Sequence, residues 1–538
     1  MQMTRRSKIV ALGLGVAAIL WFAQAGLSQQ HGPTAPSGTP SPLPYPMTPC
    51  NMNCSDTGNV VAVTSGFLLD NGKHRLFVLT DVGADNDDNQ SLVRLVLYSN
   101  DIDIEGLVAT TSTFMMDRTN PQIIRDVIDA YSEVRSNLVQ HDSHYPTGAY
   151  LQSLIKVGVP VYGMAGVGPG KDSEGSNLLI SALKKPDPRP LWVSIWGGPN
   201  VLAQALWKIR STESAIEAQR LIGKLRVYAI LDQDDSGMWI RKEFPDLFYI
   251  CSGCATRPFT GGRGFNMPPD PTADMVSKEW IAKNVQEGHG PLGEVYPDTA
   301  YGNEGDTPSY LSLIPNGLND PEHPDFGGWG GRFQYIIPDF VPPTPVPPSV
   351  RSQNVVLHTS PETRPFWTNA EDSYPTPMAP RGRGSFGLVA QTTDNTLPAK
   401  SFLFTTSRWR EDVQNDFAAR MEWTTKPFSQ ANHPPIPVLG ANTPEEFYVH
   451  SGKEFHLNAT GSHDPDGDSL SYYWFEYVEA GDVPEPINIR PFAQNLADLP
   501  VVAPAVTSPK TVHFILRVTD KGTPPLSRYK RVIVHILP

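Results

Sequence analysis

The chain has 538 residues, 39% of them hydrophobic, and a formal net charge of −13. This length predicts two or three domains, with enough apolar residues for sizeable cores. The negative charge argues against a nucleic-acid partner, because binding to phosphates requires clustered Lys and Arg.

The first 25 residues follow the pattern of a secretory signal peptide. Arg5 and Arg6 form a basic start, residues 9–22 are mostly apolar, and Ala23 and Ala25 fit a cleavage site with small residues at both positions. The alternative, an uncleaved membrane anchor, would need a longer apolar stretch. We therefore expect cleavage near Ala25 and a secreted or periplasmic protein without stable membrane insertion.

Residues 26–72 are rich in Pro, Ser, Thr and Gly, which predicts a linker. From residue 73, strand-like and helix-like patterns alternate. This predicts βαβ units and an α/β domain over residues 73–428, with an open, mostly parallel sheet and helices on both faces. The predicted strands lie at residues 76–80, 104–110, 159–163, 191–196, 225–231 and 247–250. The predicted helices lie at residues 89–98, 121–134, 199–209 and 214–222.

The pattern changes after this region. Residues 338–348 are dense in proline, which excludes a regular helix or an inner strand, and we expect an irregular insertion up to about residue 400. Residues 412–423 then predict a helix that closes the first domain. The remaining residues, 432–538, contain short alternating segments that predict an all-β sandwich of the immunoglobulin-like type. Its clearest strand patterns lie at residues 455–458 and 512–518.

Four cysteines form two local pairs, Cys50 with Cys54 and Cys251 with Cys254. Export favours disulfides over free thiols. A zinc site built from both pairs lacks His-rich spacing, and a redox motif at the second pair lacks a thioredoxin-like context. We therefore expect structural disulfides, and the sequence leaves their pairing open.

Four carboxylates follow the first predicted strand, at Asp81, Asp85, Asp87 and Asp88. A strand that leads into an acidic turn and then a helix places them at the carboxyl edge of a parallel sheet, where open α/β proteins bind ligands. Carboxylates this close resist ionising together, and a bound cation such as Ca²⁺ would keep them charged. The alternative is that they complement the helix dipole, for which one or two would suffice.

Three further loops carry candidate residues. Residues 196–200 read Trp-Gly-Gly-Pro-Asn, and glycines at a strand end let the backbone approach a ligand closely. Residues 232–235 read Asp-Gln-Asp-Asp and precede Trp239, a combination that suits the hydroxyls and the apolar face of a sugar. Asp306 stands just before the apolar residues 310–314. Each has a structural alternative: a plain strand-to-helix turn for the first loop, a solvated acidic loop for the second and a helix cap for Asp306.

Taken in order, these motifs resemble those of the nucleoside hydrolases. Residues 81–88 resemble the aspartate signature that opens that fold, and residues 196–199 resemble the turn in which a backbone carbonyl meets the metal. Gly305-Asp306 stands in the place of the late His-Asp pair. Together with residues 104–111, 232–235 and 328–332, the run resembles a secreted bacterial nucleoside-hydrolase-like family, often labelled cellulose-binding or sugar-binding. The resemblance covers about residues 73–425, and the C-terminal module is similar to that family's immunoglobulin-like tail.

The resemblance implies a calcium ion that binds sugar hydroxyls and the attacking water. The implied metal ligands are Asp81 or Asp85, Asp88, Asp306 and the backbone at Gly197. The implied substrate contacts are Asp87, Asp232, Trp239 and Trp329. The base would be Asp85, with Asp81 as second choice. The loop at residues 232–235 is an addition to the family pattern, and its Asp234 or Asp235 is a possible acid.

One departure concerns Gly305, because nucleoside hydrolases carry there the His that protonates the leaving base. We expect a calcium-dependent hydrolase that cleaves a glycosidic bond in a sugar or an N-glycoside. The first alternative is a carbohydrate-binding protein without catalysis, and a weaker one is an adhesin that works through its β-sandwich. The sugar, the anomeric outcome and the oligomeric state, including a homo-oligomer, stay open.

A second acidic turn, at residues 463–468, reads His-Asp-Pro-Asp-Gly-Asp. It resembles the aspartate-rich turn of polycystic-kidney-disease-type and cadherin-like repeats, which would imply a second calcium ion. Asp-Pro and Asp-Gly pairs are also turn chemistry, and on that ground we expect a solvated turn. The module is then a spacer or a docking domain.

Overall fold

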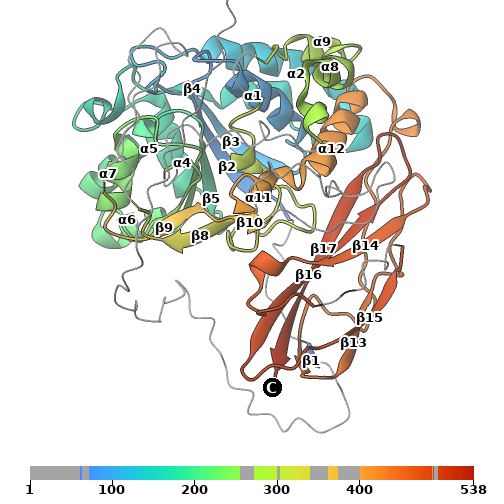
Figure 1. The fold of residues 1–538 in the computed structure, drawn as a ribbon. Helices are drawn as coiled ribbons and strands as arrows, with labels where there is room; N and C mark the ends of the chain where they lie inside the picture. Colours follow the sequence, from blue (N-terminus) through green and yellow to red (C-terminus); the bar gives the residue numbers. More distant parts are fainter. Residues whose placement is uncertain are drawn as a thin grey trace, which may run out of the picture. The chain divides into compact units, whose positions relative to one another are not determined.

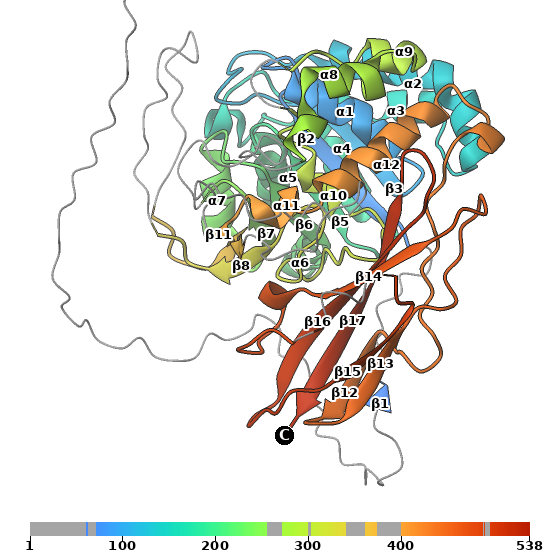
Figure 2. The same ribbon diagram turned by 45° about the vertical axis from the view of Figure 1, so that its right-hand side comes forward.

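A computed structural model describes residues 61–62, 72–254, 272–299, 303–339, 361–373, 400–487, 489 and 495–538 (Figures 1 and 2). The predicted signal peptide and most of the predicted linker lie outside these residues. Among the helices described, none combines the length and the hydropathy that a membrane span needs.

The central element is a sheet to which the described residues contribute eight strands, in the order β4-β3-β2-β5-β6-β7-β9-β8. Their bounds are His74–Thr80 for β2, Ile102–Ala109 for β3, Ile155–Val157 for β4, Leu191–Ile195 for β5, Leu225–Ala229 for β6, Phe248–Cys251 for β7, Phe333–Ile336 for β8 and Phe366–Asn369 for β9. All neighbours are parallel except β8 and β9. The carboxyl ends of β2, β3, β5 and β6 therefore meet at one edge of the sheet.

Helices cover both faces of this sheet (Figure 1). One face carries α1 (Asp87–Leu97), α2 (Pro121–His141) and α12 (Arg410–Trp423), and the other carries α4 (Glu174–Lys184), α5 (Asn200–Thr212), α6 (Ala215–Gly223) and α7 (Ser236–Glu243). The shorter helices are α3 (Gly148–Ser153), α8 (Lys278–Ile281), α9 (Gly290–Glu294), α10 (Pro308–Leu311) and α11 (Phe404–Ser407). Alternation along β2 explains the two layers, because Leu76 and Val78 join one core while Phe77 and Leu79 join the other.

The C-terminal region is a β-sandwich. One sheet has the order β1-β12-β17-β16-β14, and a second pairs β13 with β15. The bounds are Val61–Ala62 for β1, Glu446–His450 for β12, Glu454–Asn458 for β13, Ser471–Glu476 for β14, Asp498–Val502 for β15, Lys510–Thr519 for β16 and Ser527–Leu537 for β17. Both sheets contribute to one core, in which Phe455 of β13 packs against Phe514 of β16.

Buried polar contacts tie the sandwich to α12. Asp412 accepts hydrogen bonds from Arg517 and from the hydroxyl of Ser527, the latter at 2.9 Å. One turn later, Asp416 pairs with Arg528 at 2.7 Å. Helix α12, which closes the α/β domain, therefore also binds strands β16 and β17 of the sandwich.

The structure confirms the predicted fold class and corrects three local predictions. The segment 159–163 is not a strand, because β4 ends at Val157 and Pro160 cannot donate to a ladder. The insertion after residue 338 is not wholly irregular, since β9 enters the main sheet between β7 and β8. The predicted linker contains β1, which pairs antiparallel with β12. The sequence also missed helices α4 and α7.

Candidate active site and metal centre

The first acidic turn lies at the carboxyl edge of the parallel sheet. Thr80 ends β2, Asp81 follows it, and α1 begins at Asp87. Asp81 and Asp88 are only 2% and 3% exposed, whereas Asp85 and Asp87 are partly exposed. Oxygens of Asp85, Asp87 and Asp88 lie within 4.8 Å of one another. The turn therefore concentrates negative charge in a partly buried place.

The late aspartate, Asp306, joins this turn. Burial and the charges of Asp81 and Asp85 raise the pKa of Asp88 well above its usual range, although the hydroxyl of Thr80 donates a hydrogen bond to it. Burial and the charges of Asp88, Asp81 and Asp85 also raise the pKa of Asp306 well above its usual range. The charges of Asp81, Asp85 and Asp88 therefore act on Asp306, although it lies more than 200 residues further along the chain.

Helix α1 holds the loop that carries Asp306. The backbone N–H of Glu304 donates a hydrogen bond to Oε1 of Gln90 at 2.9 Å. The hydroxyl of Thr307 donates one to Oγ of Ser91 at 3.0 Å. Contacts on both sides of Asp306 therefore come from the helix that also carries Asp88.

A buried ion pair between Arg94 and Glu304 strengthens this connection. Arg94 donates two hydrogen bonds to the carboxylate of Glu304 and a third to the side chain of Gln414 on α12. Glu304 has a φ of +50°, a left-handed conformation that few residues other than glycine adopt. The ion pair therefore holds an unfavourable backbone conformation two residues before Asp306.

The glycines after β5 allow two aspartates to approach the turn closely. A Cβ atom at Gly197 would lie 2.8 Å from Cβ and 2.9 Å from Oδ1 of Asp81. A Cβ atom at Gly198 would lie 2.3 Å from Oδ2 of Asp234 and 2.6 Å from the carbonyl oxygen of Thr111. These distances are too short for any side chain, so glycine is required at both positions.

Asp234 is the buried carboxyl of the loop after β6. It has no exposed surface, and its Oδ1 accepts hydrogen bonds from the backbone N–H and the hydroxyl of Ser236. Burial raises the pKa of Asp234 to about 7. This side chain therefore retains a proton at a pH where an ordinary aspartate is ionised, which is the property of a general acid.

Several buried polar atoms at this edge of the sheet have no hydrogen-bond partner among the described residues. They are Thr110 Oγ1, Asn200 Oδ1, Gln233 Oε1, Asp234 Oδ2 and Asp306 Oδ2. Leaving such a group unpaired costs about 1–3 kcal/mol, so these atoms mark places for a ligand. Asp306 Oδ2 lies among carboxylates, and a set of oxygen donors with high negative charge suits Ca²⁺. The residues present therefore fit the ion that the resemblance implies.

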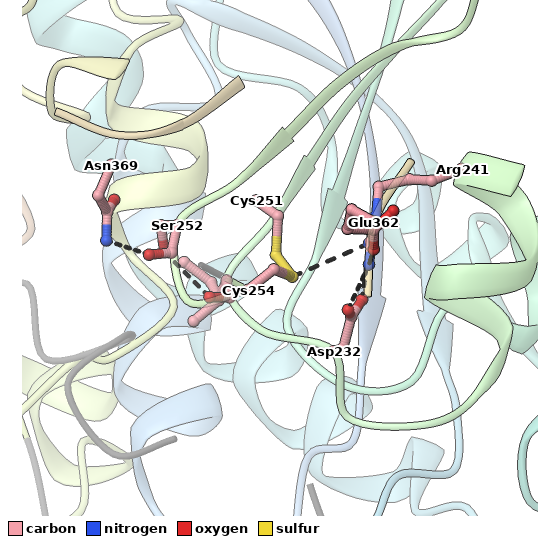
Figure 3. The surroundings of a disulfide bond; sticks show 8 residues. Asp232, Arg241, Cys251, Ser252, Cys254, Glu362 and Asn369 are labelled. Atoms are coloured by element: carbon pink, nitrogen blue, oxygen red, sulfur yellow. Dashed lines mark hydrogen bonds and ion pairs between the residues drawn. A yellow bond between two sulfur atoms is a disulfide. The ribbon is translucent and has the colours of Figure 1, made fainter. Parts of the chain in front are cut away.

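Two other residues of the 232–235 loop have structural contacts. Asp235 Oδ1 accepts the backbone N–H of Met164 at 2.8 Å. Both carboxylate oxygens of Asp232 accept hydrogen bonds from Arg241, at 3.0 and 2.7 Å, and Arg241 also pairs with Glu362 at 2.7 Å (Figure 3). A carboxylate held on both oxygens by a buried guanidinium is not available to a sugar, which corrects the role predicted for Asp232.

A disulfide joins Cys251 and Cys254 beside this ion pair (Figure 3). Cys251 is the last residue of β7, and the guanidinium of Arg241 lies 3.9 Å from Sγ of Cys254. This bond is one of the structural disulfides that the sequence predicted, and the structure supplies its pairing, which the sequence left open. The other two cysteines lie outside the described residues.

The two tryptophans predicted as sugar platforms pack against other parts of the protein. Trp329 is 1% exposed and meets the ring of Tyr529 edge to face, which corrects its predicted role, because a buried ring cannot stack on a substrate. Trp239 packs edge to face on Phe244 and lies under the guanidinium of Arg210. These contacts give Trp239 a packing role between α5 and α7.

The residues that position the aspartates were not predicted from the sequence. Arg94 carried a usable signal, because a charged residue in the apolar run of α1 implies a buried partner. Nothing in the sequence identifies Glu304 as that partner. Thr80 and Gln90 carried no signal, since both are common in turns and helices.

Two family models match the chain. The nucleoside hydrolase-like domain of cellulose-binding Sde182 matches residues 75–333, and the C-terminal domain of cellulose-binding protein Sde0182 matches residues 454–536. No curated protein matches the chain.

Two solved structures are similar to it. One is a nucleoside hydrolase-related hypothetical protein from Saccharophagus degradans that is associated with carbohydrate metabolism. It is 34% identical, with a TM-score of 0.68, over 86% of this chain and 100% of that chain. The other is the effector protein XOO4466, at 10% identity over 55% of this chain and 87% of that chain, with a TM-score of 0.26. The first match and the two family models show that the chain belongs to the family of cellulose-binding Sde182, whose first domain is nucleoside hydrolase-like.

Proposed function

We propose that the protein is a calcium-dependent hydrolase that cleaves a glycosidic bond in a sugar or an N-glycoside. The proposal depends chiefly on the buried Oδ2 of Asp306, which has no partner among the described residues and lies in the field of Asp81, Asp85 and Asp88. Such a cluster stays jointly ionised only when a cation neutralises it. The nucleoside hydrolase-like domain of the family supports the same chemistry.

The residues of the first acidic turn would bind both the ion and the substrate. The ligands of the ion would be Asp81, Asp85, Asp88, Asp306 and the backbone at Gly197. When bound, calcium would supply a positive charge that orients neighbouring sugar hydroxyls and weakly lowers the pKa of a water. Asp87, partly exposed beside Asp85 and Asp88, is placed to accept a hydrogen bond from a substrate hydroxyl.

Asp85 and Asp234 would supply the base and the acid. Asp85 is partly exposed at the cluster, so a water held there can transfer its proton to this carboxylate. Asp234 retains its proton near neutral pH, because burial raises its pKa to about 7, and it can protonate the leaving group. Asp234 would then replace the His that nucleoside hydrolases carry at the position of Gly305. Nearby carboxylates also stabilise the oxocarbenium-like transition state of glycosyl cleavage.

A carbohydrate-binding protein without catalysis is the second candidate. Both family descriptions name cellulose binding, and Gly305 removes the acid of the nucleoside hydrolases. In this case the ion and the same aspartates would hold sugar hydroxyls, and no proton would be transferred.

The test is a panel of nucleosides, aryl glycosides and cello-oligosaccharides, incubated with calcium-loaded protein, in which released base or reducing sugar is measured. We expect product from at least one class, and a loss of about 10²–10⁴-fold in kcat for Asp85→Asn. The matched control is Asp498→Asn, which removes an exposed carboxylate of the β-sandwich and should keep full activity. Binding of an oligosaccharide in a calorimeter, with no product from any class, would replace the hydrolase by the second candidate.

A further inference from the structure

The acidic turn of the β-sandwich belongs to a second group of unpaired oxygens. Asn432 Oδ1, Asp464 Oδ2 and Asp520 Oδ2 are all buried and have no hydrogen-bond partner among the described residues. Asp520 has no exposed surface and Asn432 is 6% exposed. The three residues come from three separate segments: the connection after α12, the turn after β13 and the end of β16.

Each aspartate uses one oxygen to hold its own loop and presents the other. Asp464 Oδ1 accepts the backbone N–H groups of Asp466 at 2.8 Å and Asp468 at 3.0 Å. Asp520 Oδ1 accepts those of Gly522 at 2.9 Å and Leu526 at 3.0 Å. Because both Oδ1 atoms are fixed in this way, the orientation of both Oδ2 atoms is fixed too, and the solvated turn expected from the sequence does not explain their burial.

A hydrogen bond joins Asn432 to Asp520, and the turn that carries Asp464 is bound beside them through Asp466 and His433. The side-chain amide of Asn432 donates hydrogen bonds to Asp520 Oδ1 at 3.2 Å and to the carbonyl oxygen of Pro524 at 2.7 Å. This amide nitrogen is thereby committed, and Asn432 Oδ1 is left as an acceptor. The charge of Asp464 acts on Asp520, and the backbone N–H of His433 donates to Asp466 at 2.7 Å.

We propose that Asn432, Asp464 and Asp520 form a calcium site in the β-sandwich, separate from the aspartate cluster of the α/β domain. The three donors are an amide oxygen and two carboxylate oxygens, without nitrogen or sulfur, which is the donor chemistry that Ca²⁺ prefers. The two carboxylates neutralise the charge of the ion, and backbone carbonyls and water complete the coordination.

The position of the site gives it a structural consequence. Asn432 lies in the connection between α12 and the sandwich, where the indole of Trp423 donates a hydrogen bond to its carbonyl oxygen at 2.9 Å. The next residue, His433, lies 2.8 Å from His141 of α2, measured between ring nitrogens. An ion bound at Asn432 therefore fixes the segment that joins the two domains and stabilises the chain as a whole.

The experiment counts calcium ions bound to the full chain, by elemental analysis after equilibrium dialysis. All counts are made in the background of Asp306→Asn, which removes a ligand of the site in the α/β domain. We expect one ion per chain in this background, and none after addition of either Asp464→Asn or Asp520→Asn. The matched control is Asp498→Asn in the same background, which makes the same change of charge at an exposed position and should keep one ion.

A second readout uses terbium, whose emission is sensitised by a nearby indole. Trp423 is the donor, so the Asp306→Asn protein should emit, and the further Asp520→Asn change should remove the emission. If Asp464→Asn and Asp520→Asn both bind as much calcium as Asp498→Asn, with circular dichroism showing folded protein, the site does not exist. The count also separates the two proposals: equal counts in the wild type and in Asp306→Asn would refute the site in the α/β domain and leave this one standing.

Discussion

Arg94 and Glu304 form an ion pair in which neither side chain has any exposed surface. The pair links α1, which carries Asp88, to the loop that carries Asp306. Because Glu304 is held in a left-handed conformation, the pair acts on the shape of the loop as well as on its attachment. The Arg94–Glu304 pair therefore helps to assemble the aspartate cluster, although neither residue belongs to the cluster.

The first prediction concerns this ion pair. Arg94→Met leaves the Glu304 carboxylate buried without a partner, and removing one member of a buried pair costs about 3–5 kcal/mol. The free energy of unfolding, from urea titration, should fall by this amount. The matched control is Arg118→Met, which breaks an exposed pair with Asp117 and should leave unfolding unchanged. A double variant with Glu304→Gln should recover part of the loss, and no recovery would argue against the pair as the cause.

The second prediction concerns the glycine that touches Asp81. Gly197→Ala places a Cβ atom 2.8 Å from that of Asp81, so the aspartate must move and calcium affinity in the α/β domain should fall at least 10-fold, by analogy with the loss of a group that orients a metal ligand. Gly223→Ala is the matched control, because its Cβ atom would meet nothing within 4 Å. Calcium titration in a calorimeter compares the two. Equal affinities would show that Asp81 is not a ligand.

The third prediction is a pH profile governed by Asp234. In the proposed mechanism the protonated form of Asp234 is the acid, and its pKa of about 7 lies above the ordinary value of 3.8. Activity should therefore be retained below pH 7 and fall as the pH rises through it. Asp234→Asn should lower kcat about 10²–10⁴-fold and remove this alkaline limb. Kinetics from pH 5 to about pH 9 check both results, and an unchanged limb in the variant would assign it to another group.

The same carboxyl predicts a stability difference in a defined pH window. The pKa of Asp234 is raised in the folded protein, so ionisation of this carboxyl favours the unfolded state. The resulting loss of folding free energy grows from about pH 4 to pH 7. Wild-type protein should lose stability over this window relative to Asp234→Asn. Thermal melts of both proteins at a series of pH values, without calcium, make the comparison. Parallel curves would show that Asp234 does not titrate between these limits.

The fourth prediction separates repulsion from calcium binding. In the absence of calcium, Asp306→Asn should be more stable than wild type, because it removes one of the buried like charges that raise one another's pKa. With calcium at about 100 times its dissociation constant, an intact site adds about 2.7 kcal/mol, which the variant lacks. Calorimetric melts with calcium and with a chelator should therefore reverse the order of stability. The same calcium-induced shift in both proteins would contradict a site at Asp306.

Local pattern was enough to predict the parallel sheet, the acidic turn after β2 and the C-terminal strands. Apolar runs such as residues 76–80 form buried strands because they can be covered on both faces, and the strand-turn-helix order puts residues 81–88 at the carboxyl edge. These are properties of residues close in sequence, and they predict structure without knowledge of the rest of the chain.

The tertiary structure alone decided which of the predicted side chains remain available. Asp232 and Asp234 have the same chemistry and stand two positions apart, yet Arg241 takes both oxygens of Asp232, while Asp234 keeps one unpaired. Trp329 became part of an interface because Tyr529, from the other end of the chain, covers it. The sequence by itself determined most of the strands of the parallel sheet and the edge of that sheet where polar residues gather. Partners far apart in sequence are set by packing, and packing decides whether a carboxylate is neutralised, buried alone or left to bind an ion.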